Sequence, residues 1–205
     1  MAGPPLDIGY HTLPPGCLAN VVTCLEMTER PPPRPAPAAD GLSLARMGAA
    51  DTARYRALFG RIGQDIMWFS RLIIPDQALA AIIGDPKVHS LALVRNGADI
   101  GLLEIDFRIA GECELSFFGL VPAAVGSGLG RFLMNEALAR AWSQPISRFW
   151  VHTCSFDHPA ALGFYQRSGF RPYRVMVEVH QDPRLTGHLP RHASPAAPLI
   201  EGHAV

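Results

Sequence analysis

The chain has 205 residues, 48% hydrophobic and 18% charged, which is enough to bury the core of one sizeable domain. Lysine plus arginine equals aspartate plus glutamate, at 18 each, which excludes the strong positive charge of a general nucleic-acid binder. The four cysteines form no CxxC pair, no stretch is apolar enough for a membrane span, and MAGPPLDIGY lacks the pattern of a signal peptide. We therefore expect a cytoplasmic protein that binds neither nucleic acid nor membrane.

The N-terminal part is predicted to be an arm with one strand. LANVVTCLEM (18–27) is β-branched in its middle, and TERPPPRPAPAAD (28–40) predicts an extended, polyproline-like connector. We expect residues 1–39 to form this arm, 40–183 the main domain and 184–205 an irregular tail. The predicted strand must pair with the edge of the main sheet or with a second subunit, which leaves a homodimer open.

Strands and helices alternate through the first half of the main domain. LSLARM predicts a strand, Asp51 is expected to cap a helix, and a second helix is predicted at 76–83. Three strands follow at 89–95, 99–108 and 113–121, and Asn96-Gly97 between the first two is a strong tight-hairpin signal. The apolar residues of the first helix keep three-and-four spacing: Tyr55, Leu58, Phe59, Ile62 and Ile66.

The second half begins with a glycine-rich stretch that opens a helix. A strand at 147–154, a helix at 159–168 that ends at Gly169, and a closing strand at 171–179 follow it. The element order after the arm is β α α β β β α β α β. This order predicts an α/β (α+β) fold with a mixed sheet whose front half is antiparallel.

Gly126, Gly128 and Gly130 stand on alternate positions at the mouth of this helix. The spacing is not the dinucleotide fingerprint, since Arg131 follows the last glycine, and no Gly-Lys-Ser/Thr is present for a P-loop. Successive free N–H groups there would form an anion site, aided by the helix dipole. The alternative is that the glycines only allow the helix to pack closely.

Two motifs together resemble the GNAT superfamily of acyl-CoA-dependent N-acyltransferases. They are LVPAAVGSGLG (120–130), a strand that leads through Val121-Pro122 into the glycine stretch, and ALGFYQRSGF (161–170). The element order matches the family from about residue 42 to residue 179. Val125 departs from the family pattern, because it stands where the family carries Gln or Arg.

The resemblance implies a fold and a cofactor site. A largely antiparallel sheet would have helices on both faces and a V-shaped splay between the parallel strands at 113–121 and 147–154. Acetyl-CoA would be the co-substrate, without a metal. Its pantetheine would pair with Phe118, Gly119 and Leu120. Its pyrophosphate would lie on Val125, Gly126, Ser127, Gly128, Leu129 and Gly130, with Arg131 as a compensating charge.

Acyl transfer to an amine needs a base and benefits from an acid at the departing thiolate. We expect Glu114 to be the base, on the same strand face as Ser116 and Phe118 if no bulge intervenes. Some family members carry a catalytic glutamate at this strand position. Glu104 and Asp106 are competitors that would instead attract a cationic acceptor. Tyr165 matches the family tyrosine and would be the acid.

The acceptor side is predicted from the helix pair around RIGQDIMWFSRLIIPD (61–76). By family analogy Trp68, Arg71 and Glu104 would bind the acceptor, which we expect to be a primary amine of a small molecule. A protein lysine or N-terminus, or a non-catalytic acyl-CoA-binding module, are the alternatives. Asp157 or His158 is expected to cap the helix that follows.

Overall fold

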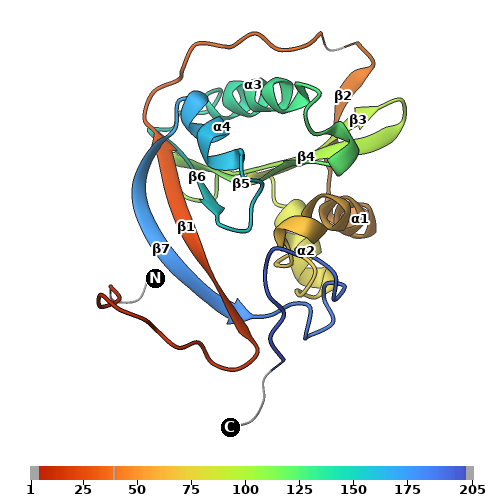
Figure 1. The fold of residues 1–205 in the computed structure, drawn as a ribbon. Coiled ribbons are helices and arrows are strands. Elements are labelled where there is room, and N and C mark those ends of the chain that lie inside the picture. The colour runs from red at the N-terminus through yellow and green to blue at the C-terminus, as the bar shows by residue number, and fades with distance from the viewer. Residues whose placement is uncertain (1–4, 39, 202–205) are drawn as a thin grey trace.

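A seven-stranded sheet with helices on both faces forms the centre of the computed structural model, which describes residues 5–38 and 40–201 (Figure 1). The strands are β1 (Cys17–Met27), β2 (Leu42–Met47), β3 (Val88–Arg95), β4 (Ala98–Asp106), β5 (Glu112–Leu120), β6 (Arg148–Cys154) and β7 (Arg171–Gln181). The helices are α1 (Thr52–Gly63), α2 (Asp76–Ile83), α3 (Leu129–Ala141) and α4 (Ala161–Arg167).

The strand order is β2-β3-β4-β5-β6-β1-β7, and β5–β6 is the one parallel pair among the described residues. Helices α1 and α2 cover one face of the sheet, while α3 and α4 cover the other (Figure 1). Apolar side chains from both faces and from the helices form the core, with Phe59 and Phe149 among the largest fully buried ones. The predicted mixed, largely antiparallel fold is confirmed.

Of the two pairings expected for the strand of the N-terminal arm, the structure has the one within the chain's own sheet. Strand β1 pairs antiparallel with β6 on one side and β7 on the other, as an inner strand. Leu25, in the middle of this strand, is 0% exposed. The arm therefore supplies an inner strand of the sheet, whose pairing partners are far away in the sequence and could not be read from its local pattern.

The predicted hairpin and the predicted first helix are both present, with one difference in the role of Asp51. Asn96 and Gly97 have φ of 52° and 77°, as a two-residue turn with two left-handed positions requires. Asp51 precedes α1, but its carboxylate accepts the Gly48 N–H at 2.8 Å and so closes the short 3₁₀ turn Ala49–Asp51. Asp51 thus stands directly before α1, as expected, but its side chain stabilises the turn between β2 and α1 and does not cap the helix.

A bulge in β5 decides which side chains share a face. Glu104 pairs with Phe117 and Ile105 pairs with Leu115, so Ser116 is an extra residue in β5. After the bulge, Phe117 packs against Phe59 under α1, and Phe118 points to the opposite face. The expected common face of Glu114 and Phe118 is therefore wrong, because the bulge inverts the alternation between them.

The two irregular segments pack on the domain. The proline-rich connector runs along α3 and α4, where the Arg34 carbonyl accepts from Asn135 at 2.8 Å and Pro37 lies against Gly128. In the tail, buried Arg184 pairs with Asp182 at 2.7 Å and donates to backbone carbonyls of the last described residues, including Ala197 at 2.8 Å. Across residues 5–38 and 40–201, no helix is both long and apolar enough to cross a membrane.

Strand β1 yields a test of its inner position. Leu25→Ala should lower the free energy of unfolding by about 2–5 kcal/mol, because it leaves a cavity in the core. Val21→Ala on the same strand should cost less than about 1 kcal/mol, since Val21 is 49% exposed. Urea unfolding measures both. If both variants lost the same small amount of unfolding free energy, the inner position of β1 would be contradicted.

Candidate active site

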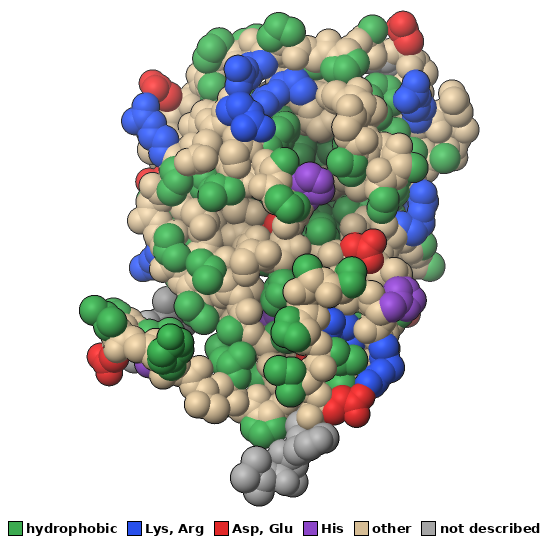
Figure 2. All heavy atoms as spheres, viewed as in Figure 1, with side chains coloured by type: hydrophobic (Ala, Val, Ile, Leu, Met, Phe, Trp, Pro, Cys, Tyr) green, Lys and Arg blue, Asp and Glu red, His purple; other side chains and the backbone are tan. Residues whose placement is uncertain are grey.

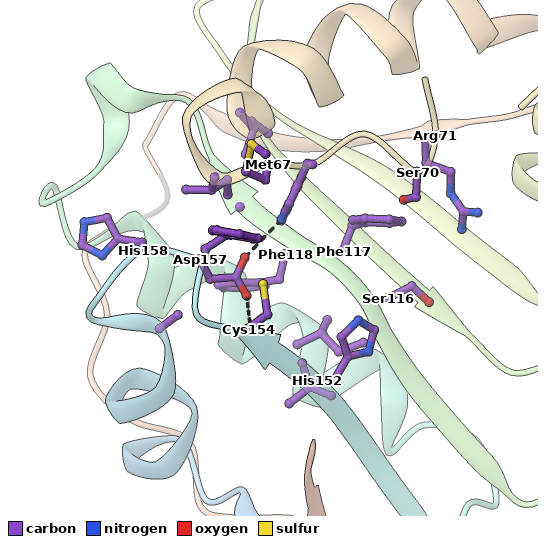
Figure 3. Close-up of a pocket in the computed structure, with 18 of the residues that line it drawn as sticks. Met67, Ser70, Arg71, Ser116, Phe117, Phe118, His152, Cys154, Asp157 and His158 are labelled. Atoms are coloured by element: carbon purple, nitrogen blue, oxygen red, sulfur yellow. Dashed lines mark hydrogen bonds between the residues drawn. The ribbon is translucent and has the colours of Figure 1, made fainter. Parts of the chain in front are cut away.

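A cavity of about 810 Å³ opens between the diverging ends of β5 and β6 and the loop between α1 and α2 (residues 64–75; hereafter the α1–α2 loop). It brings together about half of the residues that the sequence singled out, among them Arg71 and Phe118 (Figure 3). Those that line it are Glu114, Tyr165, Trp68, Arg71, Phe118, Gly119, Leu120 and Val125. Glu104, Gly126, Ser127, Gly128, Leu129, Gly130 and Arg131 lie outside its wall.

The cavity exists because β5 and β6 separate. Their parallel pairing covers three positions and ends at Glu114↔Trp150. Beyond that point the β5 edge that faces β6, residues 115–120, pairs on this side with no strand of the part of the chain that the structure describes. A ligand with amide groups could pair with this free edge as an added strand, as the resemblance implies.

The glycine loop fits an anionic ligand. Gly126 and Gly128 both have φ of 82°, a left-handed conformation that favours glycine, and a Cβ on Gly126 would meet nothing within 4 Å. The side chain of Val125 is exposed, and the Ser127 Oγ turns inward to donate to the Ala124 carbonyl at 2.6 Å. The backbone around Gly126 therefore lies beside open space, which suits phosphate oxygens, while Pro37 of the connector covers Gly128.

Arg131 turns away from this loop. Its guanidinium donates to the Ser168 Oγ at 3.0 Å and stacks on the Phe164 ring at 4.8 Å. Burial, with Arg34 and Arg167 nearby, lowers the pKa of Arg131. Arg34 itself donates to the Arg167 carbonyl, so the connector, α3 and α4 bring three guanidinium groups together. None of the three forms an ion pair within the described part of the chain.

Glu114 is the carboxylate at the point of separation. Burial, reinforced by the negative charge of Asp106, raises its pKa from 4.5 to about 7. Across the splay, the His152 Nδ1 lies 3.9 Å from the Glu114 Oε1, which is too long for a hydrogen bond. Asp106 is held by Arg108 at 2.6 Å. Glu114 is therefore the lining carboxylate for which the protonated and the ionised forms are both populated near neutral pH.

Tyr165 lies on the opposite side of the splay. It is 7% exposed, and its ring contacts Phe118, Phe164 and Phe170 edge-on. Burial raises the pKa of its phenol well above the ordinary value, so the hydroxyl keeps its proton at neutral pH. A phenol that remains protonated can donate a proton or a hydrogen bond into the cavity.

Arg71 and Glu104 form a buried ion pair at 2.7 Å. Glu104 is 0% exposed, and it also accepts from the Tyr55 hydroxyl and the Ser90 hydroxyl, each at 2.8 Å. Three donors hold the Glu104 carboxylate outside the cavity wall. There it fixes the position of the Arg71 guanidinium. Arg71 itself lines the cavity and lies over the Phe117 ring at 5.0 Å.

Trp68 is tied to β6 through Asp157. The indole N–H donates to one Asp157 oxygen at 3.3 Å, and the other oxygen accepts from the Thr153 hydroxyl at 2.6 Å and the Cys154 N–H at 3.0 Å (Figure 3). Asp157 therefore does not cap α4. His158 takes part of that role, because its Nδ1 accepts from the Ala160 N–H at 3.1 Å.

Glycine at position 119 permits this arrangement. A Cβ there would lie 2.5 Å from the Ile62 side chain and 3.0 Å from the Trp68 ring. The indole thus packs directly on the β5 backbone, beside the Phe117 ring at 5.1 Å. Gly119 contributes to the site through this close packing, which its place in the sequence did not predict.

Sequence reasoning missed the wall formed by β1 and β7. Asn20, Glu178 and His180 line the cavity from these strands, and Asn20 donates to the Glu178 carboxylate at 3.0 Å. The three residues lie outside the two motifs, and only the insertion of β1 beside β7 brings them to the site. Alternation along β7 places Glu178 and His180 on one face, which was the one available signal.

Metal and thiolate chemistry gain no support from the geometry. No group of three or more His, Cys, Asp or Glu side chains suited to a metal occurs among residues 5–38 and 40–201. Burial raises the pKa of Cys154 to about 11, so its thiol is protonated at neutral pH.

The raised pKa of Glu114 predicts a pH dependence of stability. The folded state keeps this proton where the unfolded state has released it, so the free energy of unfolding should fall as pH rises from 4.5 to about 7. The total loss is up to about 3 kcal/mol. In Glu114→Gln this contribution should vanish, whereas Glu136→Gln, at a partly exposed residue of α3, should keep it. Urea unfolding across this pH range measures it, and identical profiles for wild type and Glu114→Gln would contradict the assignment.

Comparisons with known proteins agree with this geometry. Residues 59–170 match the acetyltransferase (GNAT) family. Over 77 residues the chain is 35% identical to a mycothiol acetyltransferase from Jonesia denitrificans, a match that covers 38% of this chain and 24% of that protein. The matched part is thus about a quarter of that relative's length.

Solved structures share the fold at low identity. A GCN5-related N-acetyltransferase from Sphaerobacter thermophilus superposes with a TM-score of 0.60 at 17% identity, over 80% of this chain and 52% of that one. A putative GNAT-family acetyltransferase from Novosphingobium aromaticivorans gives 0.56 at 16% identity, over 84% and 70%. The family match spans more than half of the residues, and the splayed sheet agrees with it. The chain therefore belongs to the acetyltransferase (GNAT) family.

Proposed function

We propose that this protein transfers an acetyl group from acetyl-CoA directly to a primary amine of a small molecule. One observation carries the proposal: a single cavity joins the free edge of β5, a carboxylate with a pKa of about 7 and a protonated tyrosine. The open glycine loop lies just beyond its Val125 end. Family membership supports the reaction class.

The donor side is assigned to the free edge and the loop. Backbone groups of Phe118, Gly119 and Leu120 would pair with the pantetheine amides, and the N–H groups of residues 125–130 would hold the pyrophosphate. Acetyl-CoA supplies the thioester carbonyl that the amine attacks. Since Val125 offers no polar side chain, the loop would bind through its backbone.

The arginines near α4 support an anionic ligand on this side. Figure 2 shows basic side chains gathered over α3 and α4, and Arg34, Arg131 and Arg167 are close enough for two of them to lower the pKa of the third. Such a cluster without an acidic partner favours phosphate. We propose that Arg131 acts here, at the far end of the cofactor, while backbone N–H groups bind the pyrophosphate.

Glu114 and Tyr165 would carry the proton transfers. Glu114 accepts a proton from the ammonium, the freed nitrogen forms a bond to the thioester carbon, and the C–S bond then breaks. Tyr165 gives its proton to the departing sulfur, and the proton lost by the new amide restores the phenol. With Glu114 on one side of the splay and Tyr165 on the other, the base and the acid approach the reacting centre from opposite directions.

Acceptor binding is assigned to Trp68 and Arg71, which line the cavity from the α1–α2 loop. Glu104 would act indirectly, by holding the Arg71 guanidinium. The wall from β1 and β7, together with the tail that packs Leu189 and Ala193 against Met67, limits the acceptor side and favours a small molecule over a protein chain.

The catalytic roles predict separable kinetic defects. Glu114→Gln should lower kcat by about 10²–10⁴-fold and remove the rise of kcat/KM near pH 7, because the amine then loses its base. Tyr165→Phe should lower kcat with little change in acetyl-CoA affinity. Thiol release over an amine panel measures these rates, and Glu136→Gln serves as the control. Acetyl-CoA binding without turnover of any amine would instead favour a non-catalytic binding module.

The glycine loop offers a matched pair of substitutions. Gly126 and Gly97 have similar φ, 82° and 77°, and a Cβ on either would meet nothing within 4 Å. Alanine should therefore strain the backbone by a similar amount, about 1–2 kcal/mol, at both positions. Only Gly126→Ala should weaken acetyl-CoA binding, by about tenfold, as measured by calorimetry. Equal affinity in both variants would remove the loop from the proposed site.

A further inference from the structure

The charges that line the cavity do not balance. Its two arginines are both engaged, Arg71 by Glu104 at 2.7 Å and Arg108 by Asp106 at 2.6 Å. Four of the five lining carboxylates form no ion pair with Lys or Arg within the described part of the chain: Asp65, Glu114, Asp157 and Glu178. A bound cation would meet unneutralised carboxylates, whereas a bound anion would find no free guanidinium.

Asn20 and Glu178 form a built unit within this wall. They lie directly opposite each other on β1 and β7, and the Asn20 amide N–H donates to the Glu178 Oε2 at 3.0 Å. A carboxylate only accepts, so this bond fixes the orientation of the amide. The Asn20 Oδ1 is then left without a donor among the described residues, in a side chain that is 4% exposed.

Both atoms that remain free in this pair are hydrogen-bond acceptors, the Asn20 Oδ1 and the Glu178 Oε1. The Asn20 Oδ1 has almost no accessible surface, so a ligand that donates hydrogen bonds would meet the Glu178 carboxylate, which the Asn20 amide holds in place at the cavity wall. The neighbouring lining is aromatic, because the Phe69 ring lies 4.8 Å from the His180 ring and Phe156 lies 6.3 Å from it. A carboxylate beside aromatic faces suits an alkylammonium group.

We propose that Asn20 and Glu178 form a second ammonium subsite, so that the acceptor is a diamine or longer oligo-amine whose distal cation binds there while its other amine reacts. This inference rests on the proposed function for the reacting end. The subsite lies outside residues 59–170, which match the family, so the β1 and β7 strands would set the specificity of this chain.

Binding measured without catalysis tests the subsite. Calorimetry on the full chain would compare a series of α,ω-diamines of increasing length, each beside the alkylamine of the same length, at neutral pH where all are protonated. At the best length the diamine should bind about tenfold more tightly than its monoamine. Glu178→Gln should bring the ratio of diamine affinity to monoamine affinity close to one. Glu178→Lys should bring this ratio below one. Glu136→Gln, which removes one negative charge from a partly exposed residue of α3 outside the cavity wall, should leave the ratio unchanged.

The outcomes separate this subsite from the proposed reaction. A ratio near one for the wild type at every length, or a ratio that Glu178→Gln does not change, overturns the subsite. If a diamine binds as expected but neither of its amines is acetylated with acetyl-CoA, the proposed transfer fails and the subsite stands. Thermal unfolding of each variant shows whether a lost ratio reflects a lost fold, and the exposed position of Glu178 makes both substitutions compatible with folding.

Discussion

The site depends on the short parallel pairing of β5 with β6. Three registered positions join the strands, and the pairing ends at Glu114↔Trp150. Beyond that point β5 pairs only with β4, and the bulge at Ser116 increases the local twist of the strand. The same divergence leaves a backbone edge free for a ligand and encloses Glu114 enough to raise its pKa. A longer ladder would remove both features at once.

Buried polar contacts hold the cavity walls around this divergence. Glu104 fixes Arg71 beneath the α1–α2 loop, and Asp157 joins the Trp68 indole to the end of β6. Each contact joins segments distant in the sequence, so that loop is positioned from two sides. Because an unpaired buried charge is costly, the Glu104 carboxylate and the Arg71 guanidinium stabilise each other in one arrangement. Under the proposed function, Glu104 would thus shape the acceptor side without contacting the acceptor.

Much of this could be predicted from local sequence patterns, since periodicity, Asn96-Gly97 and the glycine stretch each report on neighbouring residues. What local patterns did not predict depends on distant partners. The inner place of β1 depends on β6 and β7, the face of Phe118 depends on a bulge, and the role of Asp157 depends on Trp68. Glu104 and Glu114 look alike in the sequence. The ring of donors around Glu104 distinguishes it from Glu114, which is partly buried beside the negative charge of Asp106.

The placement of β1 also explains how one fold can keep its chemistry while its acceptor changes. The free edge, the glycine loop, Glu114 and Tyr165 all lie between residues 59 and 170, where the family match is found. The wall that carries Asn20, Glu178 and His180 comes from strands on either side of that region, which meet only in the folded sheet. Substitutions in that wall can alter the charge that faces the acceptor without moving the β5–β6 divergence. Under the proposed function, specificity and catalysis would therefore rest on separate parts of the chain that share one cavity.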